Sequence, residues 1–243
     1  HFKNEGIHIE RALEQHSQFV KTLKDNGIDV ILLPYHKKYP EQVFTRDIGF
    51  TLGQTIFVAK MATDVRSGEE NVLKQWLEDE EISYYNLAEE RIEGGDVVID
   101  RETIYVGLSN RTDQRTAEQL QRLLNQFNVI TIPFKEKYLH LDCVFNVVSS
   151  EVALIYPNAL TKKDIDLFAS RYDLIEVSEK EQFQLGTNVL SIGNERVLSL
   201  PVNENVNKQL RTRGFQVIEV DITEIIKSGG SFRCCTLPIL RET

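Results

Sequence analysis

Along this chain, short strand-like runs of apolar residues alternate with segments in which apolar residues are three or four positions apart. This order repeats after roughly 47 residues. Each repeat opens with two apolar runs separated by two or three turn-forming residues, a pattern that predicts a β-hairpin. The paired runs cover residues 47–52 and 55–59, then 96–99 and 103–106, then 143–148 and 152–155. A period of this length indicates a fold assembled from repeated supersecondary units.

A helix and a third strand follow each hairpin. Apolar residues three and four positions apart form one face of an α-helix. In the three repeats these residues are Val72, Leu73, Trp76 and Leu77; Ala117, Leu120, Leu124 and Phe127; and Ile165, Phe168 and Ala169. The third strands are predicted over residues 82–85, 129–132 and 174–177. Each repeat is therefore expected to be a ββαβ unit.

A fourth unit follows the same order. Its hairpin covers residues 189–192 and 197–200, Val206 and Leu210 mark its helix, and its last strand covers residues 215–220. The fifth unit is expected to be divided between the two ends of the chain. It consists of a helix over residues 12–23, a strand over residues 28–33 and a terminal strand over residues 234–240.

The terminal strand needs a partner, which we expect to lie before the first helix. The chain begins with His1 and no full strand precedes Glu10, so we expect an N-terminal segment to be missing. Joining the two ends in one unit removes exposed sheet edges. We therefore predict an α/β fold of five ββαβ units with pseudo-fivefold symmetry, forming one domain over residues 1–243.

Four polar motifs recur at one place in the repeat. They are Phe44-Thr45-Arg46-Asp47, Glu93-Gly94-Gly95-Asp96, His140-Leu141-Asp142 and Gly229-Gly230-Ser231-Phe232-Arg233-Cys234. Asp47 and Glu93 are 46 residues apart, Glu93 and His140 are 47 apart, and His140 and Cys234 are 94 apart. The fourth unit carries Thr187 and Asn188 at this place, which we interpret as structural. The shared position predicts that the four motifs meet in one site.

These residue types are those needed to cleave a guanidinium group. Asp47 and Asp142 can hold the planar cation through charge-assisted hydrogen bonds. Cys234 supplies a thiolate nucleophile. His140, oriented by Glu93, can serve as acid and base. Because His140 and Asp142 are two residues apart, an extended segment would point both side chains the same way.

Each residue also has a simpler interpretation when taken alone. A histidine before a strand can be structural, a free cysteine can be a small buried apolar residue, and Asp47 and Asp96 can cap turns. A zinc site could use His140, Cys143, Cys234 and Cys235, but the chain has no CxxC or HxxxH spacing. It also has no GxGxxG or P-loop motif for nucleotides.

Composition limits the partners. A net charge of −9 and a pI near 5.2 argue against nucleic acid or an anionic membrane surface. The chain has no run of 18 apolar residues and no signal-like start, so we expect a soluble protein. Three cysteines do not make a disulfide framework, which favours the cytoplasm. A small-molecule substrate is the expected partner, and a homodimer is compatible with the sequence.

Two stretches of the sequence resemble a known family. They are Glu93-Gly94-Gly95-Asp96-Val97-Val98, continuing through Val106-Gly107-Leu108-Ser109-Asn110-Arg111-Thr112-Asp113-Gln114-Arg115, and Arg233-Cys234-Cys235-Thr236. Over essentially the whole chain, the sequence resembles the dimethylarginine dimethylaminohydrolases of the guanidino-group-modifying superfamily. The resemblance implies a five-bladed α/β propeller and covalent catalysis without cofactor or metal.

The resemblance also implies a role for each site residue. Cys234 would attack the guanidinium carbon, and His140 would protonate the departing amine and then activate water. Glu93 would hold the imidazolium, and Asp47 the guanidinium. Arg111 and Arg66 match positions that bind a substrate α-carboxylate, although both could instead be solvated surface residues. Glu41 matches an acid near the substrate α-amine.

The sequence departs from this family at two positions. The family usually carries Glu-Asp where this chain has Arg46-Asp47, and a lysine where it has Asp142. Both motifs are instead similar to arginine deiminases and amidinotransferases. We predict a hydrolase that converts arginine or Nω-methylated arginine to citrulline. The alternatives are an arginine deiminase, an amidinotransferase, in which an aspartate commonly replaces Glu93, and a catalytically silent arginine-binding relative.

Overall fold

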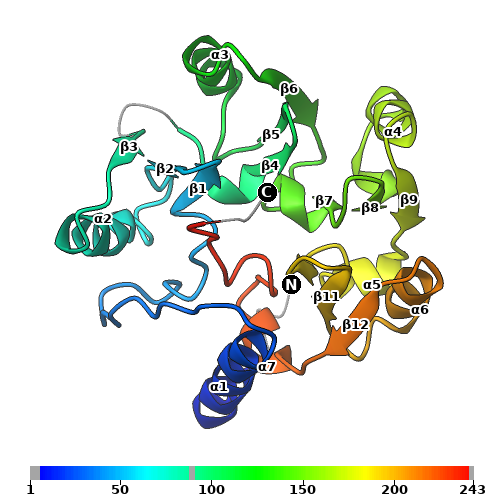
Figure 1. Cartoon of the computed structure of the whole chain (residues 1–243), viewed down its shortest axis with the longest axis horizontal. Helices are drawn as coiled ribbons and strands as arrows, with labels where there is room; N and C mark the ends of the chain where they lie inside the picture. The colour runs from blue at the N-terminus through cyan, green and yellow to red at the C-terminus, as the bar shows by residue number, and fades with distance from the viewer. Residues whose placement is uncertain (1–5, 88–90, 241–243) are drawn as a thin grey trace. The chain divides into compact units, whose positions relative to one another are not determined.

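The computed structural model describes residues 6–87 and 91–240. These residues form four three-stranded sheets. The strands are β1 (Gly49–Leu52), β2 (Thr55–Val58) and β3 (Tyr84–Asn86); β4 (Val97–Asp100), β5 (Thr103–Leu108) and β6 (Asn128–Pro133); β7 (Phe145–Val147), β8 (Val152–Ile155) and β9 (Asp173–Glu176); and β10 (Leu190–Ser191), β11 (Arg196–Ser199) and β12 (Gln216–Glu219). Figure 1 draws the strands of these sheets as arrows.

Every sheet has the same topology. Its first two strands pair antiparallel, and its third strand pairs parallel with the middle strand. A parallel pair needs a crossover connection, and a helix supplies it in each unit. These helices are α2 (Glu70–Asp79), α3 (Gln114–Leu123), α4 (Lys162–Ala169) and α6 (Glu204–Thr212). The prediction of four ββαβ units is confirmed.

The remaining helices connect units or lie near the ends of the chain. They are α1 (Ile9–Asp25), α5 (Glu179–Phe183), α7 (Thr223–Ile226) and the 3₁₀ turns η1 (Gly94–Asp96), η2 (Leu141–Cys143) and η3 (Pro157–Ala159). The pattern predicted α1, but the short helices α5 and α7 were not predicted. Helices of four or five residues are too short to show an apolar period.

Local chemistry fixes the hairpins and helix ends. Gly53, in the β1–β2 turn, has a φ of 59°, a conformation that glycine adopts without a steric penalty. At the start of α3, the side chain of Asp113 accepts a hydrogen bond from the backbone N–H of Thr116. The predicted apolar face of this helix ran to Phe127, whereas α3 ends at Leu123. Leu124 and Phe127 still pack against the apolar cluster of the second sheet.

The predicted strands of the fifth unit are not formed. Residues 28–33 and 234–240 have no strand structure in the described part of the chain. In the four observed sheets, the middle strand hydrogen-bonds to both neighbours. A fifth sheet would need such a middle strand before α1, a place that lies outside the described residues. Within the described residues, segments 28–33 and 234–240 have no neighbouring strand to pair with.

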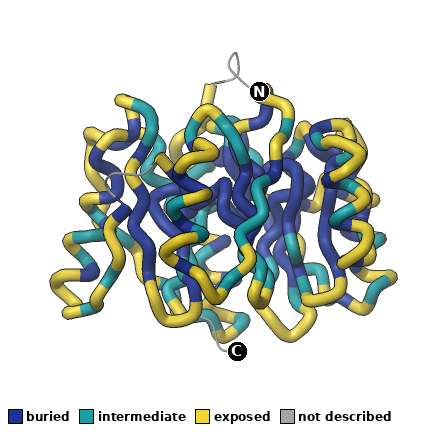
Figure 2. Tube along the Cα trace, turned by 90° about the horizontal axis from the view of Figure 1, so that it is seen from above, coloured by how far each residue is buried: buried dark blue, intermediate teal, exposed yellow. Residues whose placement is uncertain are grey.

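The chain divides into two compact units, each built from three sequence segments. We call residues 33–142, 159–161 and 234–243 the site unit, and residues 1–32, 143–158 and 162–233 the second unit. The core of the site unit consists of two apolar clusters, around Phe57 and Ile104 and around Ile56 and Leu73. The second unit is built around Leu154, Val197 and Leu210. Figure 2 shows that buried positions follow the strands, whereas exposed positions follow the turns.

No helix in the described ranges is both long enough and apolar enough to span a membrane. The described residues also form no closed sheet, since their strands belong to four separate sheets. The observed architecture is therefore an α/β arrangement of small repeated sheets.

Candidate active site

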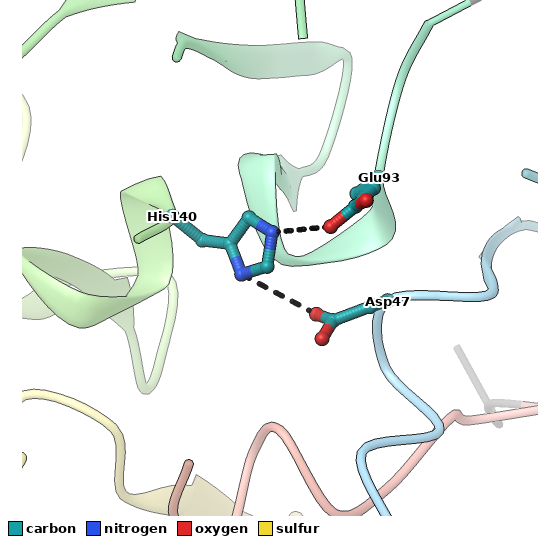
Figure 3. Close-up of side chains that lie close together, drawn as sticks. All are labelled: Asp47, Glu93 and His140. Atoms are coloured by element: carbon teal, nitrogen blue, oxygen red, sulfur yellow. Dashed lines mark hydrogen bonds and ion pairs between the residues drawn. The ribbon is translucent and has the colours of Figure 1, made fainter. Parts of the chain in front are cut away.

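The polar motifs lie at equivalent places in the repeated units. Asp47 comes two residues before β1, Glu93 directly before η1 and β4, and His140 directly before η2 and β7. Each ββαβ repeat starts in the same way. The three side chains, one from the start of each of three repeats, therefore lie close together within the site unit. Figure 3 shows the His140 ring between the carboxylates of Glu93 and Asp47.

Two carboxylates flank the His140 imidazole. Its Nε2 lies 2.8 Å from Glu93 Oε2, and its Nδ1 lies 3.4 Å from Asp47 Oδ1. All three side chains are at most 3% exposed. Among the described residues, neither His140 Nδ1 nor Asp47 Oδ1 has a hydrogen-bond partner. His140 Nδ1 and Asp47 Oδ1 are thus buried and face each other at a distance too long for a strong hydrogen bond.

The carboxylates favour an imidazolium. Burial alone lowers the pKa of His140, but Asp47, Glu93 and Asp96 together raise it to about 10. Burial alone raises the pKa of Glu93, but His140 and Arg111 help to lower it to about 2. The pair is therefore a charged imidazolium and carboxylate at neutral pH, which prepares His140 to donate a proton.

Asp96 supports the segment that carries His140. It is fully buried, and it accepts hydrogen bonds from Leu141 N at 2.9 Å and from Ser109 Oγ at 2.6 Å. Burial raises the pKa of Asp96 to about 6, against the lowering effects of His140 and its hydrogen bonds. The sequence interpretation treated Asp96 only as a turn residue. The Glu-Gly-Gly-Asp motif that contains Asp96 was the sequence feature that could have indicated this supporting role.

Cys234 lies beside Asp142. Its Sγ is 4.0 and 3.9 Å from the two carboxylate oxygens, and both residues are buried. The expectation of an extended His140–Asp142 segment is wrong, because η2 begins at Leu141. Cys234 and its neighbour Cys235 lie in a turn and not in a strand.

Cys235 has different surroundings from Cys234. Its side chain is partly buried, and burial followed by the nearby Asp47 carboxylate raises the pKa of its thiol. A thiol with a raised pKa is a weak nucleophile near neutral pH. The electrostatic surroundings therefore disfavour Cys235 as the attacking group.

The two arginines predicted to bind a carboxylate both pair with acids of the protein. Arg66 is only 1% exposed and contacts Asp47, Glu69 and, at 3.6 Å, Glu41. Its burial excludes the interpretation of a solvated surface residue. The Nη1 atom of Arg111 donates to Glu93 Oε2 at 3.1 Å, and its side chain remains 17% exposed.

The predicted residues therefore fall into two groups. Asp47, Glu93, His140, Arg66 and Arg111 form one chain of contacts, with Glu41 at its edge. Cys234 and Asp142 form a second pair. The backbone N–H of Arg46 donates to Cys234 O at 3.0 Å and so connects the Asp47 segment with the cysteine.

One group of side chains has the spacing of metal ligands. Single ligand atoms of Asp47, Glu93 and His140 all lie within 4.8 Å of one another. Within the described part of the chain, the cysteines of the alternative zinc site do not belong to such a group. His140 already bonds Glu93, and Asp47 already pairs with Arg66. The same three side chains place a proton donor beside two carboxylates, an arrangement that suits proton transfer.

Comparison with known proteins identifies several related sequences. The chain is 50% identical over 241 residues to the uncharacterized protein YkgA of Bacillus subtilis, covering 99% of this chain and 84% of YkgA. It is 29% identical to N(G),N(G)-dimethylarginine dimethylaminohydrolase of Mycobacterium tuberculosis, covering 96% and 77%. The bifunctional arginine dihydrolase/ornithine cyclodeaminase ArgZ of Synechocystis is 28% identical, and this chain covers 33% of it.

Solved structures agree with this grouping. The N-terminal domain of ArgZ, an arginine dihydrolase crystallised with its substrate, matches with a TM-score of 0.88 and 27% identity, covering 96% of this chain and 88% of that domain. The family described as N,N dimethylarginine dimethylhydrolase, eukaryotic, matches residues 1–241. The chain therefore belongs to the dimethylarginine dimethylhydrolase family.

Proposed function

We propose that this protein is a hydrolase that cleaves a C–N bond of an arginine-type guanidino group, with Cys234 as the nucleophile. The observation that carries this proposal is the buried imidazole of His140 between the carboxylates of Glu93 and Asp47, in the site unit that also contains Cys234 and Asp142. A binding protein has no need of a nucleophile or of a prepared proton donor. The relatives with named activities, which act on arginine or dimethylarginine, support the same chemistry.

The proposed reaction has two halves. The thiolate of Cys234 forms a bond to the guanidinium carbon, the C–N bond to the departing amine breaks, and His140 gives that amine its proton. A thiouronium then links the substrate to Cys234. In the second half His140 takes a proton from water, the resulting hydroxide attacks the same carbon, and the thiolate leaves. Glu93 orients the His140 ring by its 2.8 Å contact and stabilises the imidazolium form before the first proton transfer and after the second.

The two aspartates favour an unmethylated substrate. If Asp142 accepts hydrogen bonds from one guanidinium nitrogen and Asp47 from another edge, free arginine satisfies both carboxylates. A dimethylated nitrogen has no N–H to donate, so one buried carboxylate would remain unpaired. We expect this mismatch to cost about 3 kcal/mol, which is roughly a hundredfold in kcat/KM. The similarity to ArgZ, an arginine dihydrolase, supports this preference.

Dimethylarginine is the second candidate substrate, because the matching family is named after its hydrolysis. The test compares kcat/KM for arginine and asymmetric dimethylarginine, with citrulline, ornithine, ammonia and dimethylamine as measured products. A preference for arginine supports our assignment. A clear preference for dimethylarginine would show that Asp142 does not contact the guanidinium. Absence of turnover with either compound, in unmodified protein whose Cys234 reacts with an alkylating reagent in a parallel sample, would contradict the proposed reaction.

We further infer that the repeated units belong to a five-bladed α/β propeller within a single domain. The four observed ββαβ units and the pairing of α1 with α7 inside the second unit support this inference. A crystal structure that includes a strand before α1 tests it, since that strand should complete a fifth sheet.

A further inference from the structure

The fourth unit carries Thr187 and Asn188 at the place where the other units carry the polar motifs of the site. Both residues are 0% exposed. Neither side chain titrates near neutral pH, so this unit supplies no acid or base to the reaction. A buried polar side chain is normally hydrogen-bonded within the protein. The partners of this segment therefore show what the fourth unit contributes.

Thr187 holds the residue that follows Asp142. Its hydroxyl donates to the backbone carbonyl of Cys143 at 2.5 Å, and Nε2 of Gln182 donates to the same oxygen at 3.4 Å. Cys143 is the last residue of η2, the turn that also contains Asp142. The carbonyls at the end of a short helical turn have no partner inside the turn and need donors from elsewhere. Thr187 thus fixes the end of the turn from which the Asp142 side chain extends.

Asn146, in β7, connects the same segment with Arg233, the residue before the proposed nucleophile. Its Nδ2 donates to Thr187 O and to Val189 O, both at 2.8 Å. Its Oδ1 accepts a hydrogen bond from Arg233 Nη1 at 3.5 Å. The backbone N–H of Arg233 also donates to Asn188 O, at 3.4 Å. Asn146 is 1% exposed and uses both its N–H groups and its oxygen within this cluster.

These anchors act on residues that are bonded directly to the reacting groups. Asp142 is bonded to Cys143 and Cys234 to Arg233, and every anchoring contact lies within the second unit. The Sγ of Cys234 lies 3.9 Å from Asp142 Oδ2. Because each anchored residue is one peptide bond from a reacting residue, loss of an anchor should shift the thiol relative to the carboxylate. A misplacement of about 1 Å can cost about a hundredfold in rate.

We propose that the fourth unit positions the nucleophile. Thr187 and Asn146 are positioning residues that keep the nucleophilic thiol beside the carboxylate of Asp142. They act through the backbone neighbours of the reacting residues and are not themselves catalytic. The inference rests on the proposed guanidino hydrolysis, and it gives a role to a unit that supplies none of the reacting groups.

The kinetic test removes one hydroxyl. Thr187→Val loses it with little change in shape, whereas Thr187→Ser keeps it. Thr22→Val is the matched control, because Thr22 in α1 is also buried and donates to a backbone carbonyl, Gln18 O, at 2.8 Å. Both valine variants should lower the Tm by about 2–4 °C. Only Thr187→Val should lower kcat/KM, by about tenfold or more, and Thr187→Ser should stay within about threefold of the wild type.

Three results would overturn the proposal. They are unchanged kinetics in Thr187→Val, an equal loss in the Thr22→Val control, and a loss in Thr187→Ser as large as that in Thr187→Val. The second would mean that the hydroxyl only stabilises the fold, and the third that its hydrogen bond is not what matters.

A second measurement does not depend on turnover. The reagent 2-chloroacetamidine carries a planar amidinium whose N–H groups can donate to a carboxylate, and 2-chloroacetamide is its neutral counterpart. With either reagent the thiolate sulfur bonds to the CH₂ carbon and chloride leaves. The ratio of the two alkylation rates at Cys234, followed by mass spectrometry, reports the alignment of thiol and carboxylate, since greater access alone raises both rates. We expect this ratio to fall at least about fivefold in Thr187→Val and to stay unchanged in Thr22→Val.

An unchanged ratio in Thr187→Val would contradict the proposal, and so would a wild-type ratio no higher than that of free cysteine. If Thr187→Val does not fold, Gln182→Met decides, because it removes the other donor to Cys143 O. We expect the ratio to fall about threefold in this variant, and an unchanged ratio would overturn the proposal. A wild-type protein that prefers the amidine reagent but turns over neither arginine nor dimethylarginine would refute the hydrolysis and leave the positioning role testable.

Discussion

Cys234 and Cys235 are neighbours whose thiols face different groups. Cys234 Sγ lies beside the carboxylate of Asp142, whereas the pKa of Cys235 is raised by burial and by Asp47. We predict that Cys234→Ser abolishes turnover and that Cys235→Ser keeps most of it. Steady-state rates with the best substrate, together with mass spectrometry of the trapped covalent adduct, check this prediction. An adduct on Cys235 would reverse the assignment.

The position of Arg111 allows a test of its predicted contact with a substrate carboxylate. Its Nη1 contacts Glu93 at 3.1 Å, and its side chain is partly exposed, so it can reach a second carboxylate. A charge-assisted hydrogen bond to a substrate carboxylate contributes about 2 kcal/mol. Arg111→Ala should therefore raise KM for arginine roughly thirtyfold more than for agmatine. Equal losses with the two substrates would mean that Arg111 acts only through Glu93.

Sequence reasoning named most residues of the site but not all of their contacts. The motifs selected Asp47, Glu93 and His140, and the structure brings these three together. Glu69 was missed, although it is fully buried against Arg66. It belongs to no repeated motif, and the sequence does not show that two charged residues three positions apart will be enclosed together.

At the scale of elements, the 3₁₀ turn η1 holds Glu93 and its neighbours close to His140. A Cβ on Gly95 would lie 2.6 Å from His140 Nδ1 and 2.7 Å from Asp47 Oδ1. Gly95→Ala should therefore separate these two groups, costing about 1–3 kcal/mol of stability and lowering kcat at least about tenfold. Thermal unfolding and steady-state kinetics measure the two effects.

Gly6→Ala is a matched control, because a Cβ at Gly6 meets no atom within 4 Å. If Gly95→Ala had wild-type kinetics, the close approach between η1 and His140 would not matter for the reaction. Gly94 is less suitable for this purpose. A Cβ there would lie 2.0 Å from the backbone oxygen of Gly49, so that the variant would disturb the fold directly.

The hairpins were predicted within one or two residues because alternating apolar runs and turn residues are local signals. The segments 28–33 and 234–240 show where this reasoning ends. They are apolar enough to resemble strands, but a strand forms only where a neighbouring backbone can complete its hydrogen bonds. The same limit applies to the His140–Asp142 segment, in which η2 replaces the extended conformation.

At the scale of the whole molecule, the repeat period predicted four units correctly, and the site residues of the first three lie in one compact unit. The division of the chain into two compact units was not predicted. Both units interleave distant segments, and a pattern of local apolar periods contains no information about which distant segments pack together.

The pH dependence of stability reflects the buried ion pair. The pKa of Glu93 is about 2 in the folded protein instead of 4.5, so its contribution is complete above pH 4.5 and is lost as the pH falls toward 2. The pKa of His140 is about 10 instead of 6.5, so its contribution is complete below pH 6.5 and is lost as the pH rises toward 10. Asp96 acts in the opposite direction to Glu93, since its pKa rises from 3.8 to about 6 and its ionisation between these values destabilises the folded state.

Above pH 6.5, His140 is the only one of these three groups still changing its charge. We therefore predict that the Tm falls between pH 6.5 and 10, with each kcal/mol lost lowering the Tm by about 2–4 °C for a chain of this length. In His140→Gln the ion pair is absent at every pH, so the variant should start from a lower Tm and show a flatter decline over this range. His36→Gln, at an exposed position, should follow the wild type. Thermal unfolding followed by circular dichroism at pH 6.5, 8 and 10 checks this prediction, and parallel declines in wild type and His140→Gln would show that the alkaline loss comes from other groups.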